Sequence, residues 1–194
     1  MTADKAVTAS FAPLTASCGP FSDVPCDNWA NGYISALYTA GITMGCGGGQ
    51  YCVSDAASRG QTAVAVIRAK YGEDFTYTQT PYFSDVPSSH PYFKYIQKIK
   101  DAGITTVTGS YGADDPVTRD QMAAFLIRAK YGEDFTYTQS PYFSDVPEAS
   151  AYFKYVQKLK DAGITTVSGT YYVDMPVTRD QMAAFLARTF LGMQ

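Results

Sequence analysis

Histidine is almost absent from this sequence: of its 194 residues, only His90 is a histidine. A catalytic pair of serine or cysteine with histidine would have to be built on this one residue, and a histidine-rich metal site is excluded. The acidic pairs Glu73-Asp74 and Glu133-Asp134 lie in a repeated polar turn, where we expect solvated residues rather than the two carboxylates of a glycosidase. We therefore expect no enzyme, no metal and no cofactor.

The sequence also lacks an excess of basic residues and a long apolar run. It carries 15 Lys and Arg against 18 Asp and Glu, which gives a net charge of -3. Since a surface that binds a nucleic-acid duplex is normally basic, we expect no nucleic-acid partner. No apolar run approaches the roughly 20 residues that a spanning helix needs, so we expect no membrane span. With 46% hydrophobic and 17% charged residues, the chain can bury a core.

The first residues, 1–17, lack the apolar stretch of about 7–15 residues that a secretory signal shows. Two interpretations are open: a cytosolic start, or a chain from which a leader is missing. The cysteines favour the second interpretation, because disulfides form in oxidising compartments. We therefore expect an extracellular or cell-surface location.

All four cysteines lie in the first quarter of the sequence: Cys18, Cys26, Cys46 and Cys52. None of their separations has the short spacing of a structural zinc site. Two disulfides fit better, and four cysteines allow three pairings. We favour Cys46–Cys52, which closes the glycine loop 47–49, together with Cys18–Cys26, which ties the amino-terminal arm to the first helix.

The sequence repeats itself with a period of about 60 residues. The motif Phe-Ser-Asp-Val-Pro begins at Phe21, Phe83 and Phe143. A second motif, Val-Thr-Arg-Asp-Gln-Met, begins at Val117 and Val177. Fixed repeats of this length indicate stacked units that share a core. We predict an arm (1–19) and three repeats: 20–80, 81–140 and 141–194.

Each unit has the pattern of two helices joined by a loop. In the second unit Tyr92, Ile96 and Ile99 form an apolar stripe at helical spacing, and Gly103 suits the end of that helix. The second helix begins at Thr118 with a glutamine three residues on, which is the spacing of a capping box. The same spacing recurs in the other units, at Ser58/Gln61, Thr118/Gln121 and Thr178/Gln181.

The buried face of this second helix is predicted to consist of Met122, Phe125, Leu126 and Ala129. A two-helix unit of about 60 residues is too small to bury such a face alone. Packing three units about a common axis would bury it.

These motifs resemble the S-layer homology family, whose repeat runs F-x-D-V, W-A, a helix to G-I, a glycine-containing loop and T-R-A-E. Unit one carries Phe21-Ser22-Asp23-Val24, Trp29-Ala30, Gly41-Ile42, Gly45 and Ser58-Arg59-Gly60-Gln61. The resemblance covers about 175 residues and implies a mainly α fold, with three helix-loop-helix repeats packed with pseudo-threefold symmetry around a shared helical core. It also implies a module that holds proteins on the cell envelope by binding cell-wall polysaccharide, often pyruvylated, in grooves between repeats.

An arginine stands in the first turn of each second helix, at Arg59, Arg119 and Arg179. A guanidinium matches a carboxylate, and a helix amino terminus favours anions, so an acidic sugar is a suitable ligand. The alternative is that each arginine ties down the preceding loop, for example by pairing with Asp114 or Asp174. The resemblance favours ligand binding.

The resemblance implies a set of glycan-binding candidates: Arg59, Trp29, Asp23, Gly45, Gln61, Arg119 and Arg179. We expect the main groove to be lined by Trp29 and Arg59, because the corresponding positions in the other units are Pro91 and Ala151. The loops of units two and three are also shorter by two residues. These departures keep an alternative function open: a self-assembling or protein–protein interaction subunit of a surface layer or filament, with degenerate grooves.

Overall fold

The structure, a computed structural model, describes residues 18–194. Most of the predicted arm (1–19), and with it the question of a secretory signal, therefore lies outside the described residues. Within the described range the chain forms six α-helices and no strands, which confirms the predicted mainly α fold. The helices are α1 (Asn31–Thr39), α2 (Arg59–Tyr71), α3 (Phe93–Asp101), α4 (Arg119–Tyr131), α5 (Phe153–Asp161) and α6 (Arg179–Phe190). None of these helices is long and apolar enough to cross a bilayer.

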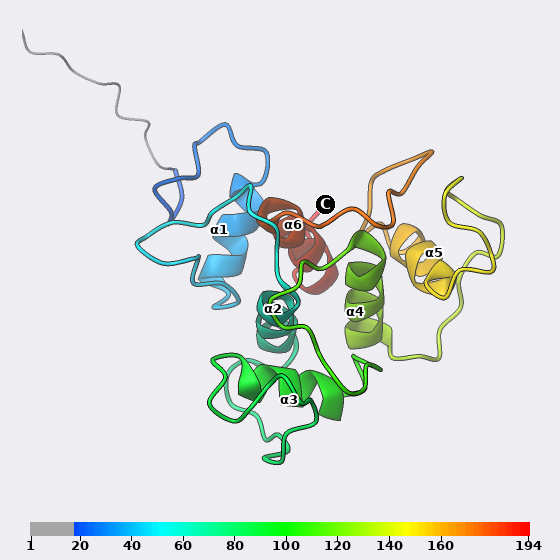
Figure 1. The fold of residues 1–194 in the computed structure, drawn as a ribbon. Coiled ribbons are helices and arrows are strands. Elements are labelled where there is room, and N and C mark those ends of the chain that lie inside the picture. Colours follow the sequence, from blue (N-terminus) through cyan, green and yellow to red (C-terminus); the bar gives the residue numbers. More distant parts are fainter. Residues whose placement is uncertain (1–17) are drawn as a thin grey trace, which may run out of the picture.

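Three helices, α2, α4 and α6, pack against one another at the centre (Figure 1). Each of the outer helices covers one of them: α3 lies on α2, α5 on α4 and α1 on α6. The first helix of each repeat thus packs on the second helix of the preceding repeat, and α1 closes the ring by packing on the last helix of the chain. The repeats interlock rather than standing side by side.

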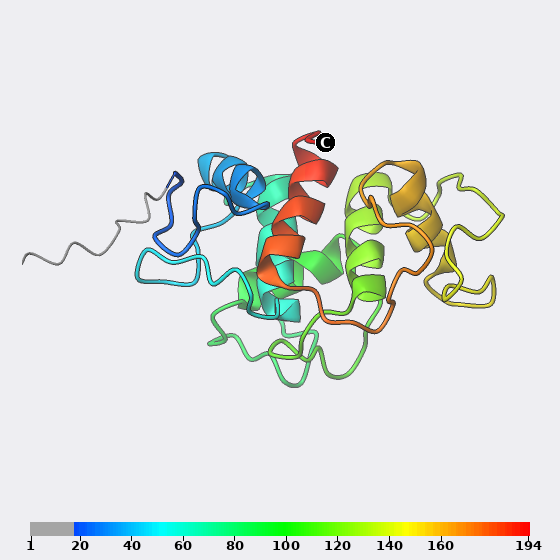
Figure 2. The ribbon, with the colours of Figure 1, turned by 90° about the horizontal axis from the view of Figure 1, so that it is seen from above.

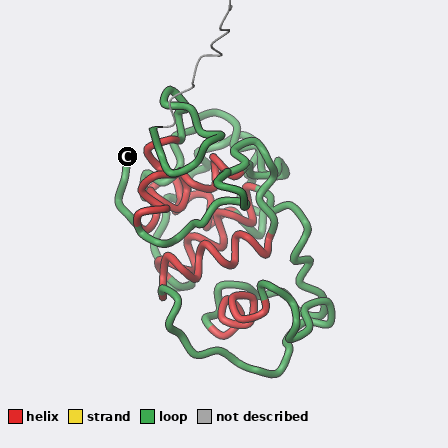
Figure 3. The backbone as a smooth tube through the Cα atoms, turned by 90° about the vertical axis from the view of Figure 1, so that its left-hand side faces the viewer, coloured by secondary structure: helices red, strands yellow, loops and turns green. Residues whose placement is uncertain are grey.

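The outer helices cross the central ones steeply. Figure 2 shows α2, α4 and α6 running alongside one another, with long loops gathered at one end of the bundle. In Figure 3 the outer helix α3 is seen end-on, whereas the core helices run across the view.

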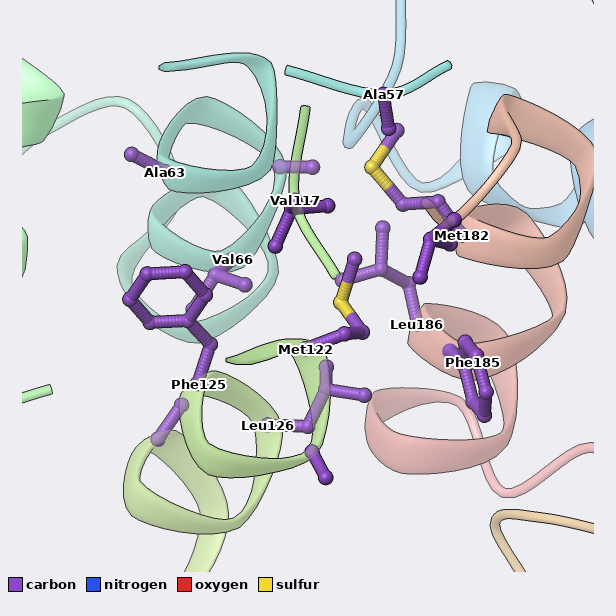
Figure 4. Packing of buried hydrophobic residues seen from close by; sticks show 14 of the residues in the cluster. Ala57, Ala63, Val66, Val117, Met122, Phe125, Leu126, Met182, Phe185 and Leu186 are labelled. Atoms are coloured by element: carbon purple, nitrogen blue, oxygen red, sulfur yellow. The ribbon is translucent and has the colours of Figure 1, made fainter. Parts of the chain in front are cut away.

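The core is built from the inward faces of the three central helices (Figure 4). The predicted face of α4 is confirmed, because Met122, Phe125, Leu126 and Ala129 are all buried. Figure 4 shows Met122, Phe125 and Leu126 of α4 in one buried cluster with side chains from the other two central helices: Ala63, Val66, Met182, Phe185 and Leu186. Burying such side chains contributes about 1.5–3 kcal/mol each, which a single repeat could not obtain alone.

A closed ring of backbone hydrogen bonds joins the three repeats just before the central helices begin. The amide of Ala57 donates to the carbonyl of Val177 (2.8 Å), Val177 donates to Val117 (2.9 Å), and Val117 donates to Ala57 (2.9 Å). All three residues are fully buried. The ring satisfies polar groups that would otherwise be costly to bury, and it fixes the register of the three repeats.

The predicted capping box forms only in the first repeat, where Ser58 and Gln61 exchange both hydrogen bonds. The prediction is wrong for Thr118/Gln121 and Thr178/Gln181, since neither threonine caps the backbone with its side chain. The hydroxyl of Thr118 donates to the carboxylate of Asp120 instead, and that carboxylate accepts from the amide of Gln121 (2.6 Å). The first repeat has Gly60 at this position, so its serine is left to cap the helix.

Both predicted disulfides are present, Cys18–Cys26 and Cys46–Cys52, and no cysteine is free. The second disulfide closes the loop that follows α1. Within this loop Gly45 has a φ of 81°, and an added Cβ would lie 2.2 Å from the carbonyl oxygen of Gln50. A side chain is therefore excluded there.

Candidate functional site

Three grooves are arranged around the central bundle, each between two central helices and the loop that follows an outer helix. We name them groove A, groove B and groove C, with volumes of about 430, 50 and 300 Å³. Each contains an arginine from the first turn of one central helix, and a glutamine and a second arginine from the next central helix. These residues are Arg179, Gln61 and Arg68 in groove A, Arg59, Gln121 and Arg128 in groove B, and Arg119, Gln181 and Arg188 in groove C.

The first-turn arginines are almost fully buried. Arg59 is 8% exposed; its Nε donates to the carbonyl of Tyr111 (2.9 Å), and its guanidinium lies over the Tyr111 ring at 4.8 Å. Arg119 and Arg179 repeat this arrangement, each donating at 2.7 Å to a tyrosine carbonyl. Each arginine therefore holds a loop, but not the preceding loop that the alternative interpretation named.

The partner of each arginine differs from the expected one. The loop held by Arg59 belongs to the following repeat, and the contacts run to a backbone carbonyl and a ring. Within the described part of the chain, no ion pair joins these arginines to Asp114 or Asp174. The remaining guanidinium nitrogens reach the grooves, where Arg59 donates to Gln121 Oε1 at 2.9 Å.

The structure does not bring Trp29 and Arg59 into one groove, so this predicted pairing is wrong. Trp29 lines groove C with Arg119, and its Nε1 donates to Asp180 (3.2 Å). The reason is the interlocking of the repeats: Trp29 stands just before α1, and α1 packs on α6 rather than on α2. Arg59 lies in groove B, where the aromatic side chain is Tyr152.

Each groove carries one aromatic ring from the start of an outer helix: Tyr92 in groove A, Tyr152 in groove B and Trp29 in groove C. The two tyrosines were missed as groove residues, because they stand one position after the residues that align with Trp29. The sequence did offer a signal for these groove residues, because the second and third repeats both have a tyrosine directly after the position that aligns with Trp29.

The other predicted glycan-binding residues fall into two groups: two of them line a groove, and one holds a loop. Gly45 and Gln61 line groove A together with Arg179. Asp23 instead holds a loop: its carboxylate accepts from the amides of Tyr51 and Cys52, both at 2.7 Å.

The aspartates that correspond to Asp23 do the same in the later repeats, where Asp85 and Asp145 accept from the amides of Tyr111 and Tyr171. Burial acts to raise the pKa of these two carboxyl groups, but the backbone amides outweigh it and the pKa of each is lowered.

A charged cluster borders groove A and was not predicted. Glu73 accepts from Arg68 (2.5 Å), Lys94 (2.7 Å) and the hydroxyl of Tyr95 (2.8 Å). Burial opposes ionisation of Glu73, but the hydrogen bonds from these three groups prevail and lower its pKa to about 2. Glu73 is thus solvent-exposed, as expected of a turn residue, but it also holds two cationic side chains, which the sequence did not predict.

The same cluster recurs beside groove B with Glu133, Arg128, Lys154 and Tyr155. Groove C lacks this cluster, because Met193 of the third repeat and Gly32 of the first repeat stand in the places of the glutamate and the lysine. There Arg188 donates to the hydroxyl of Tyr33 at 2.9 Å.

The chain matches the S-layer homology domain family at three places, residues 20–63, 82–123 and 142–183, which together make up about two thirds of its length. It therefore belongs to this family, as its motifs predicted. Domains of the family are cell-wall anchoring modules, and membership associates the chain with the cell surface.

Two similar proteins are an endoglucanase from Bacillus sp. (strain KSM-635), 32% identical over 112 residues, and an amylopullulanase from Thermoanaerobacterium thermosulfurigenes, 32% identical over 110 residues. The matches cover 57% and 56% of this chain, but only 12% and 6% of the two relatives. The chain thus spans a small part of either relative. The similarity arises from the S-layer homology region, which is a binding module, and it carries no catalytic activity over to this chain.

Proposed function

We propose that the chain is a non-catalytic cell-envelope-binding module that anchors itself, or a fused partner, by holding an acidic cell-wall polysaccharide in the grooves between its repeats. A pyruvate ketal is the candidate acidic group. One observation carries the proposal: two arginines, a glutamine and an aromatic ring converge in each of three grooves.

The chemistry of this set suits an acidic sugar. Guanidinium groups donate to carboxylates in a planar, directional way, and a glutamine amide can donate to and accept from hydroxyl groups. An aromatic face packs against the apolar side of a sugar ring. Because the first-turn arginines are already fixed by Tyr51, Tyr111 and Tyr171, they would lose little conformational entropy when a ligand binds.

Sedimentation with cell-wall sacculi tests the proposal. The chain is mixed with sacculi that retain their polysaccharide and with sacculi from which the polysaccharide has been extracted. We expect the chain to sediment only with the former, and the soluble extracted polysaccharide to compete for it. Failure to sediment with either preparation would contradict the proposal.

A second candidate function is a self-assembling or protein–protein interaction subunit with degenerate grooves. The observation that favours it is the small volume of groove B, about 50 Å³, which leaves little space for a sugar unit. Light scattering across a concentration series tests it, because an assembly subunit would form oligomers without polysaccharide.

A further inference from the structure

The three grooves are not equivalent. Groove A encloses about 430 Å³, against about 50 Å³ in groove B, whereas groove C encloses about 300 Å³ and adjoins a second hollow of about 330 Å³ that shares Arg119, Val167 and Gln181 with it. Volume therefore separates groove A from groove B, and the charged lining separates it from groove C. A pocket of the size of groove A, within the usual range for a small ligand, holds a sugar unit with room to spare.

The loop beside groove A is held differently from the loops beside the other two grooves. In the other two repeats a lysine fastens the loop to the outer helix: Lys100 donates to the carbonyl of Val107 and Lys160 to that of Val167, both at 2.7 Å. The corresponding residue of the first repeat is Tyr38, whose ring packs edge-on against Phe21. The disulfide Cys46–Cys52 holds this loop instead.

Groove A is lined by one more cationic side chain than either of the other two grooves. Three cationic side chains line it, Arg68, Lys94 and Arg179, whereas two arginines line each of the other grooves. Glu73 pairs with two of the three, yet Lys94 remains 39% exposed at its side chain. An ammonium group has three donors, so Lys94 can bind a ligand carboxylate while it keeps Glu73.

In each of the other two grooves an aspartate lies near the aromatic ring, and groove A lacks this aspartate. Asp180 accepts from Trp29 at groove C, and the charge of Asp120 acts, after burial, to raise the pKa of Tyr152 at groove B. The first repeat has Gly60 in this place, and Tyr92 packs directly on it: an added Cβ would lie 2.5 Å from the tyrosine ring. An anion entering groove A therefore meets no aspartate at this point.

We propose that groove A is the principal ligand site of this chain and that Lys94 selects a sugar unit bearing a carboxylate. Arg68 and Arg179 flank the carboxylate, and the ring of Tyr92 packs against the sugar. The inference rests on the proposed function and deepens it, because it names the groove and the residue that set the specificity.

The chain contains a matched control for Lys94. Lys154 pairs with its glutamate at the same 2.7 Å and lies over equivalent aromatic rings at nearly the same distances. Lys94→Gln and Lys154→Gln should therefore cost the fold the same, which melting curves would verify. Only Lys94 lies in groove A.

The experiment is calorimetric titration with two probes: soluble cell-wall polysaccharide carrying pyruvate ketals, and the same polymer after mild acid has removed the pyruvate. We expect Lys94→Gln to weaken binding of the first probe by about tenfold, and Lys154→Gln to leave it unchanged. With the second probe the difference between the variants should disappear.

Equal affinities of the two variants for the pyruvylated probe would overturn the inference while leaving the proposed function intact, provided the wild type binds. A difference that persists after pyruvate removal would overturn the assignment of Lys94 to a carboxylate. If the wild type binds neither probe, the proposed function fails, and the inference fails with it.

Discussion

Arg59 and Tyr111 are joined by two reciprocal hydrogen bonds: Arg59 Nε donates to the carbonyl oxygen of Tyr111 at 2.9 Å, and the Tyr111 hydroxyl donates to the carbonyl oxygen of Arg59 at 3.2 Å. The same exchange joins Arg119 to Tyr171 and Arg179 to Tyr51. Each pair fixes the start of a central helix to a loop of the next repeat. The third pair connects the last repeat to the first, so the reciprocal bonds close the ring of repeats.

Removing one of these buried hydroxyl groups should destabilise the whole fold. For Tyr111→Phe we expect the free energy of unfolding to fall by about 1 kcal/mol, the usual net worth of a buried hydrogen bond. Urea unfolding would measure it. Tyr172→Phe is the control, because Tyr172 is 56% exposed and its hydroxyl lies outside this pair. Equal midpoints for the two variants would contradict the prediction.

Acid should weaken the fold through Glu73 and Glu133. The pKa of each is lowered from 4.5 to about 2 in the folded chain. Because the folded value is lower, their stabilising contribution is complete above pH 4.5 and is lost as the pH falls from 4.5 to about 2. Both side chains are nearly half exposed, so solvent screening limits each contribution to less than about 1 kcal/mol.

The double variant Glu73→Gln/Glu133→Gln tests this pH dependence. Its unfolding free energy should change less between pH 4.5 and pH 2 than that of the wild type. The double variant Asp74→Asn/Asp134→Asn removes two acidic residues from the same turns and should retain the wild-type slope. A parallel loss of stability in wild type and Glu-to-Gln protein would contradict the prediction.

Reduction of the disulfides should loosen the first repeat rather than the whole molecule. Both disulfides close short loops in that repeat, and each is expected to stabilise it by about 2 kcal/mol. Hydrogen exchange with and without reductant would localise the change. We expect faster exchange at residues 43–52 and little change in α4 and α5. Identical melting temperatures in both conditions would show that the disulfides do not staple this repeat.

Trp29 is the only tryptophan, so its fluorescence reports on groove C. Its side chain is 56% exposed, and iodide should quench it readily. If groove A is the principal site, saturation with pyruvylated polysaccharide should leave the emission maximum and the quenching nearly unchanged. Strong protection from iodide would instead place the ligand in groove C, beside Arg119.

Much of the fold follows from local patterns that the sequence displays directly. The stripe with Ile96 and Ile99 predicts an outer helix, and Thr118 marks the start of a central one; both residues of the stripe are fully buried, and α4 begins at Arg119. The predicted disulfides each join cysteines fewer than ten residues apart. Such features depend on residues that are close together along the chain, so they can be predicted from the sequence alone.

The composition of the grooves depends on tertiary contacts. Trp29 and Asp180 are 151 residues apart and meet only because α1 packs on α6. The spacing of Thr118 and Gln121 likewise predicted a capping box. In the structure the carboxylate of Asp120 accepts the hydrogen bond from the amide of Gln121, and the side chain of Gln121 accepts from Arg59 of the preceding repeat.

The sequence by itself determined the helices, the threefold repeat and the family, and it favoured the disulfide pairing that the structure has. Only the tertiary structure decided which arginine, glutamine and aromatic ring share a groove. The physical reason is that a repeat cannot bury its apolar faces alone and must exchange its outer helix with a neighbour, and this exchange places the groove residues of one repeat beside those of another.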